Sequence, residues 1–247
     1  MATRLRRLLT ALLLVVVLLS LGDVPRRDLV HRDLEHRNAV PQSPTPPPVR
    51  VAAAPVPAKP GTSGRFVFAT GYGRVLGSAG PVHRFRVAVE LPAPKSLAPA
   101  FAREVDRVLG DPRSWVGGRE LRLRRVPPTA YGEFTIFLAS AGTSRRMCRG
   151  GGLETGGFTS CRLPRRVIIN DSRWQGAIPG YGAPLGTYRA YAVNHEVGHQ
   201  LGHGHEACPG RGRPAPVMMQ QTYGLKGCVP NPWPYLNGRR YTGPPVR

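Results

Sequence analysis

The sequence has few acidic residues, 14 Asp and Glu against 35 Lys and Arg, which gives a formal net charge of +21. Lysine is also scarce: apart from Lys59, Lys95 and Lys226, the positive charge is carried by arginine. The zinc-knuckle, RRM and helix-turn-helix patterns of nucleic-acid-binding domains are absent, so we expect no nucleic-acid partner. The charge could instead attract an anionic cell-envelope surface, or it could serve solubility alone.

Cysteines are few as well, and none of the four belongs to a C-x-x-C pair, which argues against a cysteine zinc site. An even number at wide spacing, in a chain that begins like a secreted one, favours two disulfides. Pairing of nearest neighbours gives Cys148–Cys161 and Cys208–Cys228, and buried free thiols are the alternative. The second disulfide would enclose residues 209–227, a loop whose closure stabilises by roughly 3 kcal/mol in the chain-entropy model.

The chain has one long apolar run, residues 8–21, directly after Arg4, Arg6 and Arg7. This layout is typical of a secretory signal, and the run is shorter than the ~20 apolar residues of a transmembrane helix. Because an A-x-A cleavage site is absent, we expect residues 1–22 to be either a signal peptide or an uncleaved signal anchor. Both alternatives export the rest of the chain, which is then extracellular or attached to the cell surface.

Residues 23–62 are expected to form a linker, first charged and then rich in proline. Prolines are dense from residue 41 to residue 60, and such segments favour extended polyproline II, a semi-rigid spacer. We therefore expect one folded domain, residues 63–247, which is long enough to bury a core of ordinary size.

The pattern of apolar residues in this domain predicts strands, helices and then an irregular tail. Strict alternation predicts strands, and an apolar stripe at helical spacing predicts a helix that ends at Gly110. Glycines and two cysteines fill residues 142–163, with an edge strand expected near their end. The expected strands are 65–70, 83–91, 120–126, 133–139, 158–162 and 167–170; the expected helices are 94–109 and 184–201, and residues 171–183 are expected to be a loop. This order indicates an α+β fold with a mixed β-sheet, a long active-site helix and a small irregular C-terminal subdomain.

The second of these helices carries H-E-x-x-H, in which His195 and His199 are four residues apart. Residues at this spacing lie on one face of a helix, so both imidazoles can bind one metal ion. Glu196 projects about 60° away from His199, given ~100° per residue. It can therefore reach a metal-bound water without being a ligand, which suits a general base.

A third ligand is expected at His205. On a straight helix, a residue eight positions after His195 would lie about 12 Å along the axis, whereas zinc holds its ligands at ~2 Å. The helix must therefore stop, and Gly202 can adopt the left-handed conformation that stops it. The chain then turns back and brings His205 to the metal.

The complete pattern H-E-x-x-H-x-x-G-x-x-H resembles the signature of the metzincin zinc peptidases, which a Met-turn follows. The resemblance implies a Zn²⁺ cofactor, a protein or peptide substrate, and a methionine beneath the metal. Met218 is our choice for that methionine and Met219 the reserve. It also implies that an extended substrate pairs with the edge strand; the alternative for this segment is a disulfide-closed hairpin that does not contact the substrate. The expected function is thus a secreted or membrane-anchored zinc endopeptidase with Glu196 as general base.

The chain shares one feature with the astacin branch of this family and lacks another. Glu206 follows the third histidine as it does in astacins, but the tyrosine two residues after the Met-turn methionine is missing, and the next tyrosine is Tyr223. The chain looks more like uncharacterised secreted zinc-peptidase-like domains of high-GC Gram-positive bacteria. The alternative function, from a different class, is a catalytically silent cell-envelope binding module that retains a zinc site. The sequence predicts no oligomeric state.

Overall fold

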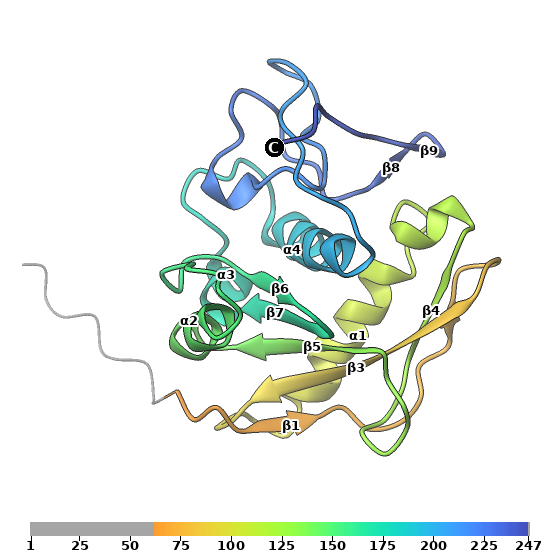
Figure 1. Ribbon diagram of the computed structural model, residues 1–247, viewed down its shortest axis with the longest axis vertical. Helices are drawn as coiled ribbons and strands as arrows, with labels where there is room; N and C mark the ends of the chain where they lie inside the picture. Colours follow the sequence, from red (N-terminus) through yellow and green to blue (C-terminus); the bar gives the residue numbers. More distant parts are fainter. Residues whose placement is uncertain (1–61, 247) are drawn as a thin grey trace, which may run out of the picture. The chain divides into compact units, whose positions relative to one another are not determined.

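The computed structural model describes residues 62–246, so the expectations for residues 1–22 and for nearly all of the linker lie outside the described residues. Within the described part, the chain has the predicted α+β fold. A mixed seven-strand sheet packs with four helices, and a separate two-strand sheet lies near the C-terminus (Figure 1). These residues belong to one compact unit, Pro55–Arg247.

The large sheet is built around four parallel strands. β3 lies between β4 and β5, and β7 follows β5; β1 and β2 pair antiparallel with β3 and β4, and β6 pairs antiparallel with β7 at the edge. The strands are β1 (Phe66–Phe68), β2 (Val75–Leu76), β3 (Val82–Glu90), β4 (Arg122–Arg125), β5 (Phe134–Ala139), β6 (Cys161–Leu163) and β7 (Arg166–Asn170).

Alternation along the central strands places one set of apolar side chains in the core. Phe85 and Val87 of β3 and Ile136 of β5 are fully buried. The helices α1 (Leu97–Leu109) and α4 (Leu185–Gln200) cover this face, and the stripe that ends at Leu109 joins the same core cluster. The predicted strands and these two helices therefore form with bounds shifted by a few residues.

The opposite face of the sheet is covered in part by α2 (Ala141–Arg149), which the sequence did not lead us to expect. The side chain of Ser140 caps its N-terminus by accepting from the Thr143 amide. Cys148 of α2 packs with Ala139 and Ile168 in a second apolar cluster on this face.

The expectation of a loop over residues 171–183 was wrong at its start, where α3 (Asp171–Gly176) forms. The Asn170 side chain accepts from the amides of Ser172 and Arg173 and caps this helix. The edge strand exists but begins at Cys161, not at Phe158.

After α4 the chain is irregular, as predicted. It contains a short 3-10 turn, Gln221–Tyr223, and the small sheet of β8 (Tyr235–Leu236) and β9 (Arg239–Arg240). Another 3-10 turn, Trp115–Gly118, lies before β4. The C-terminal segment and α4 lie side by side in Figure 1, so this segment can supply groups to a site on the helix.

Candidate metal centre

Helix α4 ends where the motif requires it to end. Its last residue is Gln200, and Gly202 then takes a φ of +96°, a left-handed value that favours glycine. The His203 amide donates to the Gly198 carbonyl (3.0 Å), which closes the turn. The chain therefore reverses direction directly after the two helical histidines.

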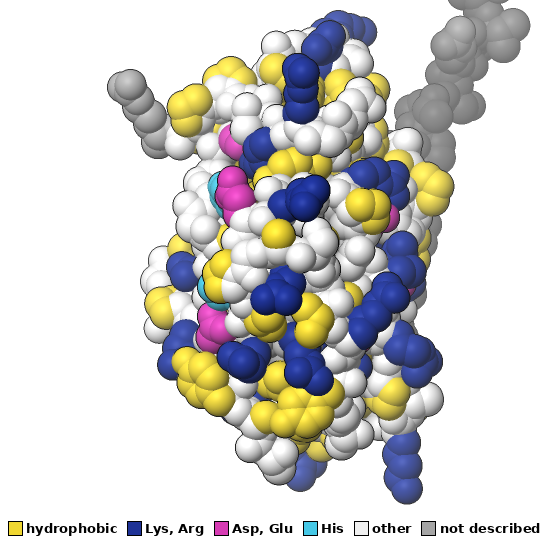
Figure 2. Space-filling view, turned by 90° about the vertical axis from the view of Figure 1, so that its right-hand side faces the viewer, with side chains coloured by type: hydrophobic (Ala, Val, Ile, Leu, Met, Phe, Trp, Pro, Cys, Tyr) yellow, Lys and Arg dark blue, Asp and Glu magenta, His cyan; other side chains and the backbone are white. Residues whose placement is uncertain are grey.

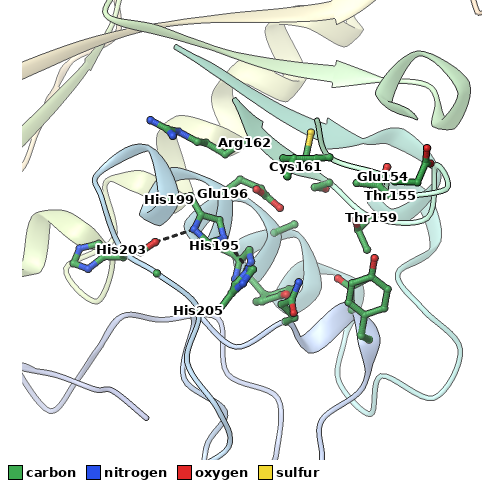
Figure 3. A pocket seen from close by; sticks show the side chains of 18 of the residues that line it. Glu154, Thr155, Thr159, Cys161, Arg162, His195, Glu196, His199, His203 and His205 are labelled. Carbon is green, nitrogen blue, oxygen red and sulfur yellow. Dashed lines mark hydrogen bonds between the residues drawn. The ribbon is translucent and has the colours of Figure 1, made fainter. Parts of the chain in front are cut away.

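This reversal brings His195, His199 and His205 together. One ligand nitrogen from each lies within 4.8 Å of the others, and the Nε2 atoms of His199 and His205 are 3.1 Å apart. His195 is buried, and the other two are half-buried (Figure 3). The three predicted metal-binding side chains thus meet at one point, as a cluster that could hold a metal ion.

Backbone carbonyls fix the orientation of two of these imidazoles. Nδ1 of His195 donates to the Val217 carbonyl and Nδ1 of His199 to the His203 carbonyl, each over 2.8 Å. Because a carbonyl oxygen can only accept, Nε2 carries the lone pair in both rings. Burial, together with the nearby His199, lowers the pKa of His195 to about 3, so this ring is neutral at physiological pH.

Glu196 lines the same cavity as the three histidines (Figure 3). Its side chain is 6% exposed, and burial raises its pKa to about 8. Within residues 62–246, no hydrogen bond to its carboxyl group is formed. The carboxyl group is thus held beside the cluster without a structural partner.

His203 lies apart from the cluster, although it belongs to the same motif. Its ring stacks on the Trp115 indole at 4.3 Å between centroids and points away from the other three histidines (Figure 3). Trp115 is itself fixed to α4, because its Nε1 donates to the Asn194 carbonyl. The His203 carbonyl therefore orients the His199 ring, and the His203 ring packs on Trp115.

Met218 and Met219 occupy different environments. Met218 is fully buried in the main core, whereas Met219 packs with Ala215 and Cys228 in a separate cluster. Gly198 lies between the helical histidines, and a Cβ there would overlap Met218 Sδ. Of the two, Met218 is the methionine that packs against the histidine-bearing turn of α4.

Three tyrosines that the sequence did not assign to the site hold the segment after Met218. The hydroxyl of Tyr181 donates to Gln221 Oε1, and that of Tyr191 donates to the Met219 carbonyl. Tyr188 shares a hydrogen bond with Thr222. These contacts join residues far apart in sequence, so spacing alone could not reveal them.

The C-terminal residues hold the third histidine. The Val246 amide donates to the His205 carbonyl (3.0 Å), and the Ala207 amide donates to the Pro244 carbonyl (2.7 Å). Glu206 forms a half-buried ion pair with Arg240 (3.0 Å). Glu206 therefore links the chain beside His205 to the C-terminal segment, a role that the sequence pattern did not indicate.

A cavity of about 600 Å³ opens over the histidines. Its walls come from the edge strand β6, from the loop before that strand and from the turn after Met219. Arg162 of β6 lies on one wall, and its Nε donates to Gln200 (3.2 Å). The exposed ring of Tyr223 lies on another wall, 5.9 Å from Phe158. The histidine cluster is thus accessible from a cleft along the edge of the sheet.

Both disulfides form with the predicted pairing, Cys148–Cys161 and Cys208–Cys228. Such bonds persist in oxidising compartments and indicate an extracytoplasmic domain. Across residues 62–246, no helix has the length and apolar character needed to cross a membrane.

The chain was compared with protein families, curated proteins and solved structures. Residues 55–228 match a family described as "Protein of unknown function (DUF3152)". No curated protein and no solved structure matches. Because the matched region covers most of the sequence and includes the whole histidine cluster, the chain belongs to the DUF3152 family of proteins of unknown function.

Proposed function

We propose that this protein is a zinc-dependent endopeptidase that acts outside the cytoplasm, either secreted or anchored by its N-terminal segment. The observation that carries the proposal is the meeting of three histidines and the buried Glu196 in one accessible cavity. Three protein ligands leave a position for water or substrate, whereas structural zinc sites usually have four.

The cluster fits zinc by its chemistry and spacing. Imidazole nitrogen is a usual zinc ligand at about 2.0–2.1 Å, which separates two ligands of a tetrahedral site by roughly 3.3 Å. The Nε2 atoms of His199 and His205 are 3.1 Å apart. Zinc held here would supply Lewis-acid chemistry, lowering the pKa of water and polarising a carbonyl.

Glu196 is proposed as the group that moves the proton. A carboxylate oxygen of Glu196 would accept a proton from the attacking water and later donate it to the leaving amine. A buried carboxyl group without a hydrogen-bond partner destabilises the fold. The absence of such a partner within residues 62–246 therefore favours a catalytic role over a silent binding module, which would not need this carboxyl group.

The edge strand β6 is proposed to hold the substrate. It is the last strand in the order of the sheet, and Cys161 and Arg162 line the cleft. An extended peptide can add to such an edge through backbone hydrogen bonds. In this binding mode the affinity comes from main-chain hydrogen bonds, which any extended segment within a polypeptide can form.

The test is the cleavage of a denatured protein mixture, with new termini mapped by mass spectrometry. We expect wild-type protein to produce new internal termini, a chelator to stop their formation, and added Zn²⁺ to restore it. If the zinc-loaded protein produces no new termini across a broad mixture, the peptidase proposal fails and the binding module is favoured.

A further inference from the structure

The face of the sheet opposite the histidine cluster has an unusual distribution of charge. α2 covers only the part of this face near the carboxyl ends of the parallel strands, where it packs on Ala139 and Ile168. Nearer the amino ends, the strands carry arginines. We call this set the arginine face: Arg84, Arg86, Arg122, Arg124 and Arg166.

The register places these arginines beside one another. Arg84 of β3 is paired with Arg124 of β4, and Arg86 and Arg166 both pair with Thr135 of β5. Arg84 and Arg124 lie opposite each other on adjacent strands, where like charges are destabilising, and Arg86 and Arg166 lie on either side of β5. Glu133 lies beside them and accepts from the Arg84 amide and from His83. The surplus of positive charge would therefore be relieved by an anionic partner.

The hydrogen bonds of these arginines leave their charge in place. Arg86 donates to the Ala130 carbonyl, Arg122 to the Gly80 carbonyl and Arg124 to the Gly73 carbonyl. A carbonyl orients a guanidinium group but does not neutralise it. Seen from the side on which β4 lies in Figure 1, basic side chains far outnumber acidic ones (Figure 2).

Two exposed tyrosines lie beside this face. Tyr72 is 59% exposed, and the Arg124 guanidinium lies over its ring at 4.9 Å. Tyr131 is 63% exposed and lies under Arg165, the neighbour of Arg166. Tyrosine and arginine both combine an apolar body with a polar end, which suits the boundary between lipid and water.

The described chain begins on the same side. The Thr62 side chain accepts from Arg146 of α2, the helix that covers the other part of this face. Upstream of residue 62 the sequence carries the linker and the apolar run of residues 8–21. The α4 helix and its histidines lie on the other face of the sheet, so a surface bound to the arginines would leave the cleft open.

We propose that the arginine face docks on the anionic headgroups of a phospholipid bilayer. Guanidinium groups match phosphate oxygens in geometry and charge. The broad sheet face, the flanking tyrosines and the side at which the described chain begins favour a lipid surface over a soluble anionic polymer. Docking would present the cleft toward the space outside the membrane.

The test uses the full chain reconstituted into vesicles, with hydroxyl-radical modification of individual tyrosines read by mass spectrometry. Vesicles contain either phosphatidylcholine alone or phosphatidylcholine with phosphatidylglycerol. We expect Tyr72 and Tyr131 to be protected only on the anionic vesicles. Tyr223, which is 52% exposed in the cleft, is the internal control and stays reactive on both.

Replacing Arg84, Arg124 and Arg166 with Gln should abolish the protection. Each arginine near an anionic surface contributes about fivefold to binding, so the docking equilibrium falls roughly 100-fold. The control variant carries the same loss of charge at the exposed Arg103, Arg211 and Arg213, and it should keep the protection.

Three results would overturn the proposal. The first is reactive Tyr72 and Tyr131 on anionic vesicles. The second is equal loss of protection in the control variant, which would indicate a general effect of net charge. The third is equal protection by soluble polyphosphate on neutral vesicles, which would assign the face to an anionic polymer instead.

Discussion

At the scale of single residues, the candidate metal centre depends on how each imidazole is held. The carbonyls of Val217 and His203 accept from Nδ1 and leave Nε2 of His195 and His199 for a metal. Three imidazoles at this spacing could hold a metal ion, and removing one should leave a much weaker site.

We predict that His205→Ala loses most of its zinc during dialysis and that His203→Ala retains it. The two histidines are two residues apart, but only His205 has its Nε2 beside that of His199. The His203 ring packs on Trp115, and its carbonyl remains in the alanine variant. Metal analysis by mass spectrometry measures both. Equal zinc in His205→Ala and wild type would exclude His205 as a ligand.

Gly198 gives a second prediction at this scale. A Cβ at this position would overlap Met218 Sδ and lie 2.6 Å from Trp115 Cζ2. Gly198→Ala should therefore lower the free energy of unfolding by about 1–3 kcal/mol through overpacking. Gly186→Ala in the same helix meets no atom within 4 Å and should be neutral or stabilising by up to about 1 kcal/mol. Urea denaturation compares them, and equal stabilities would contradict the packing of Met218 on the helix.

The sequence predicted the three histidines and Glu196 because the helical repeat and the glycine stop determine where they lie. It could not predict the groups that hold them. Trp115 reaches Asn194 and Arg240 reaches Glu206 across long stretches of chain. Such contacts depend on the complete fold and leave no periodic pattern.

At the scale of elements, strong periodicity identified most of the strands and both long helices, but the pattern failed at α2 and α3. The buried residues of α2 are small or weakly polar, Thr143, Ser144 and Cys148, so no apolar stripe is present. α3 buries only Trp174 among its six residues. In each of these helices, the one helix signal left in the sequence is the residue that caps the N-terminus, Ser140 for α2 and Asn170 for α3. A capping residue alone is too weak a signal to predict a helix.

Glu90 joins three elements at the start of α2. Its carboxylate accepts from the Gly64 amide, the Ser140 amide and the Thr143 hydroxyl. Burial raises the pKa of the Glu90 carboxyl group, but the hydrogen bonds together lower it by a larger amount. The pKa in the folded state therefore lies below 4.5. Stability from this carboxylate is therefore fully present above pH 4.5 and is lost as the pH falls through the folded-state pKa.

We predict that Glu90→Gln lowers the free energy of unfolding by about 2 kcal/mol at neutral pH. The difference from wild type should shrink as the pH falls below 4.5. Glu104→Gln, which breaks a partly exposed ion pair with Arg107, should change stability by less than about 1 kcal/mol. Urea denaturation across this pH range tests both, and a difference that does not change with pH would contradict the role of the Glu90 charge.

At the scale of the whole molecule, the sheet separates two regions of different character. One face carries α1 and α4 with the histidine cluster, and the other carries α2 and the arginine face. The sequence showed the excess of arginine but not its position, because the position depends on strand order and register.

The central claim, that the cluster is a catalytic zinc centre, is tested most directly by Glu196→Gln. This substitution keeps the shape of the side chain and all three histidines but removes the base. Zinc content should therefore stay near that of wild type, while peptide hydrolysis should fall by at least ~10²–10⁴-fold; Glu104→Gln serves as the control that keeps wild-type turnover. Equal hydrolysis by wild type and Glu196→Gln, each loaded with zinc, would contradict the account.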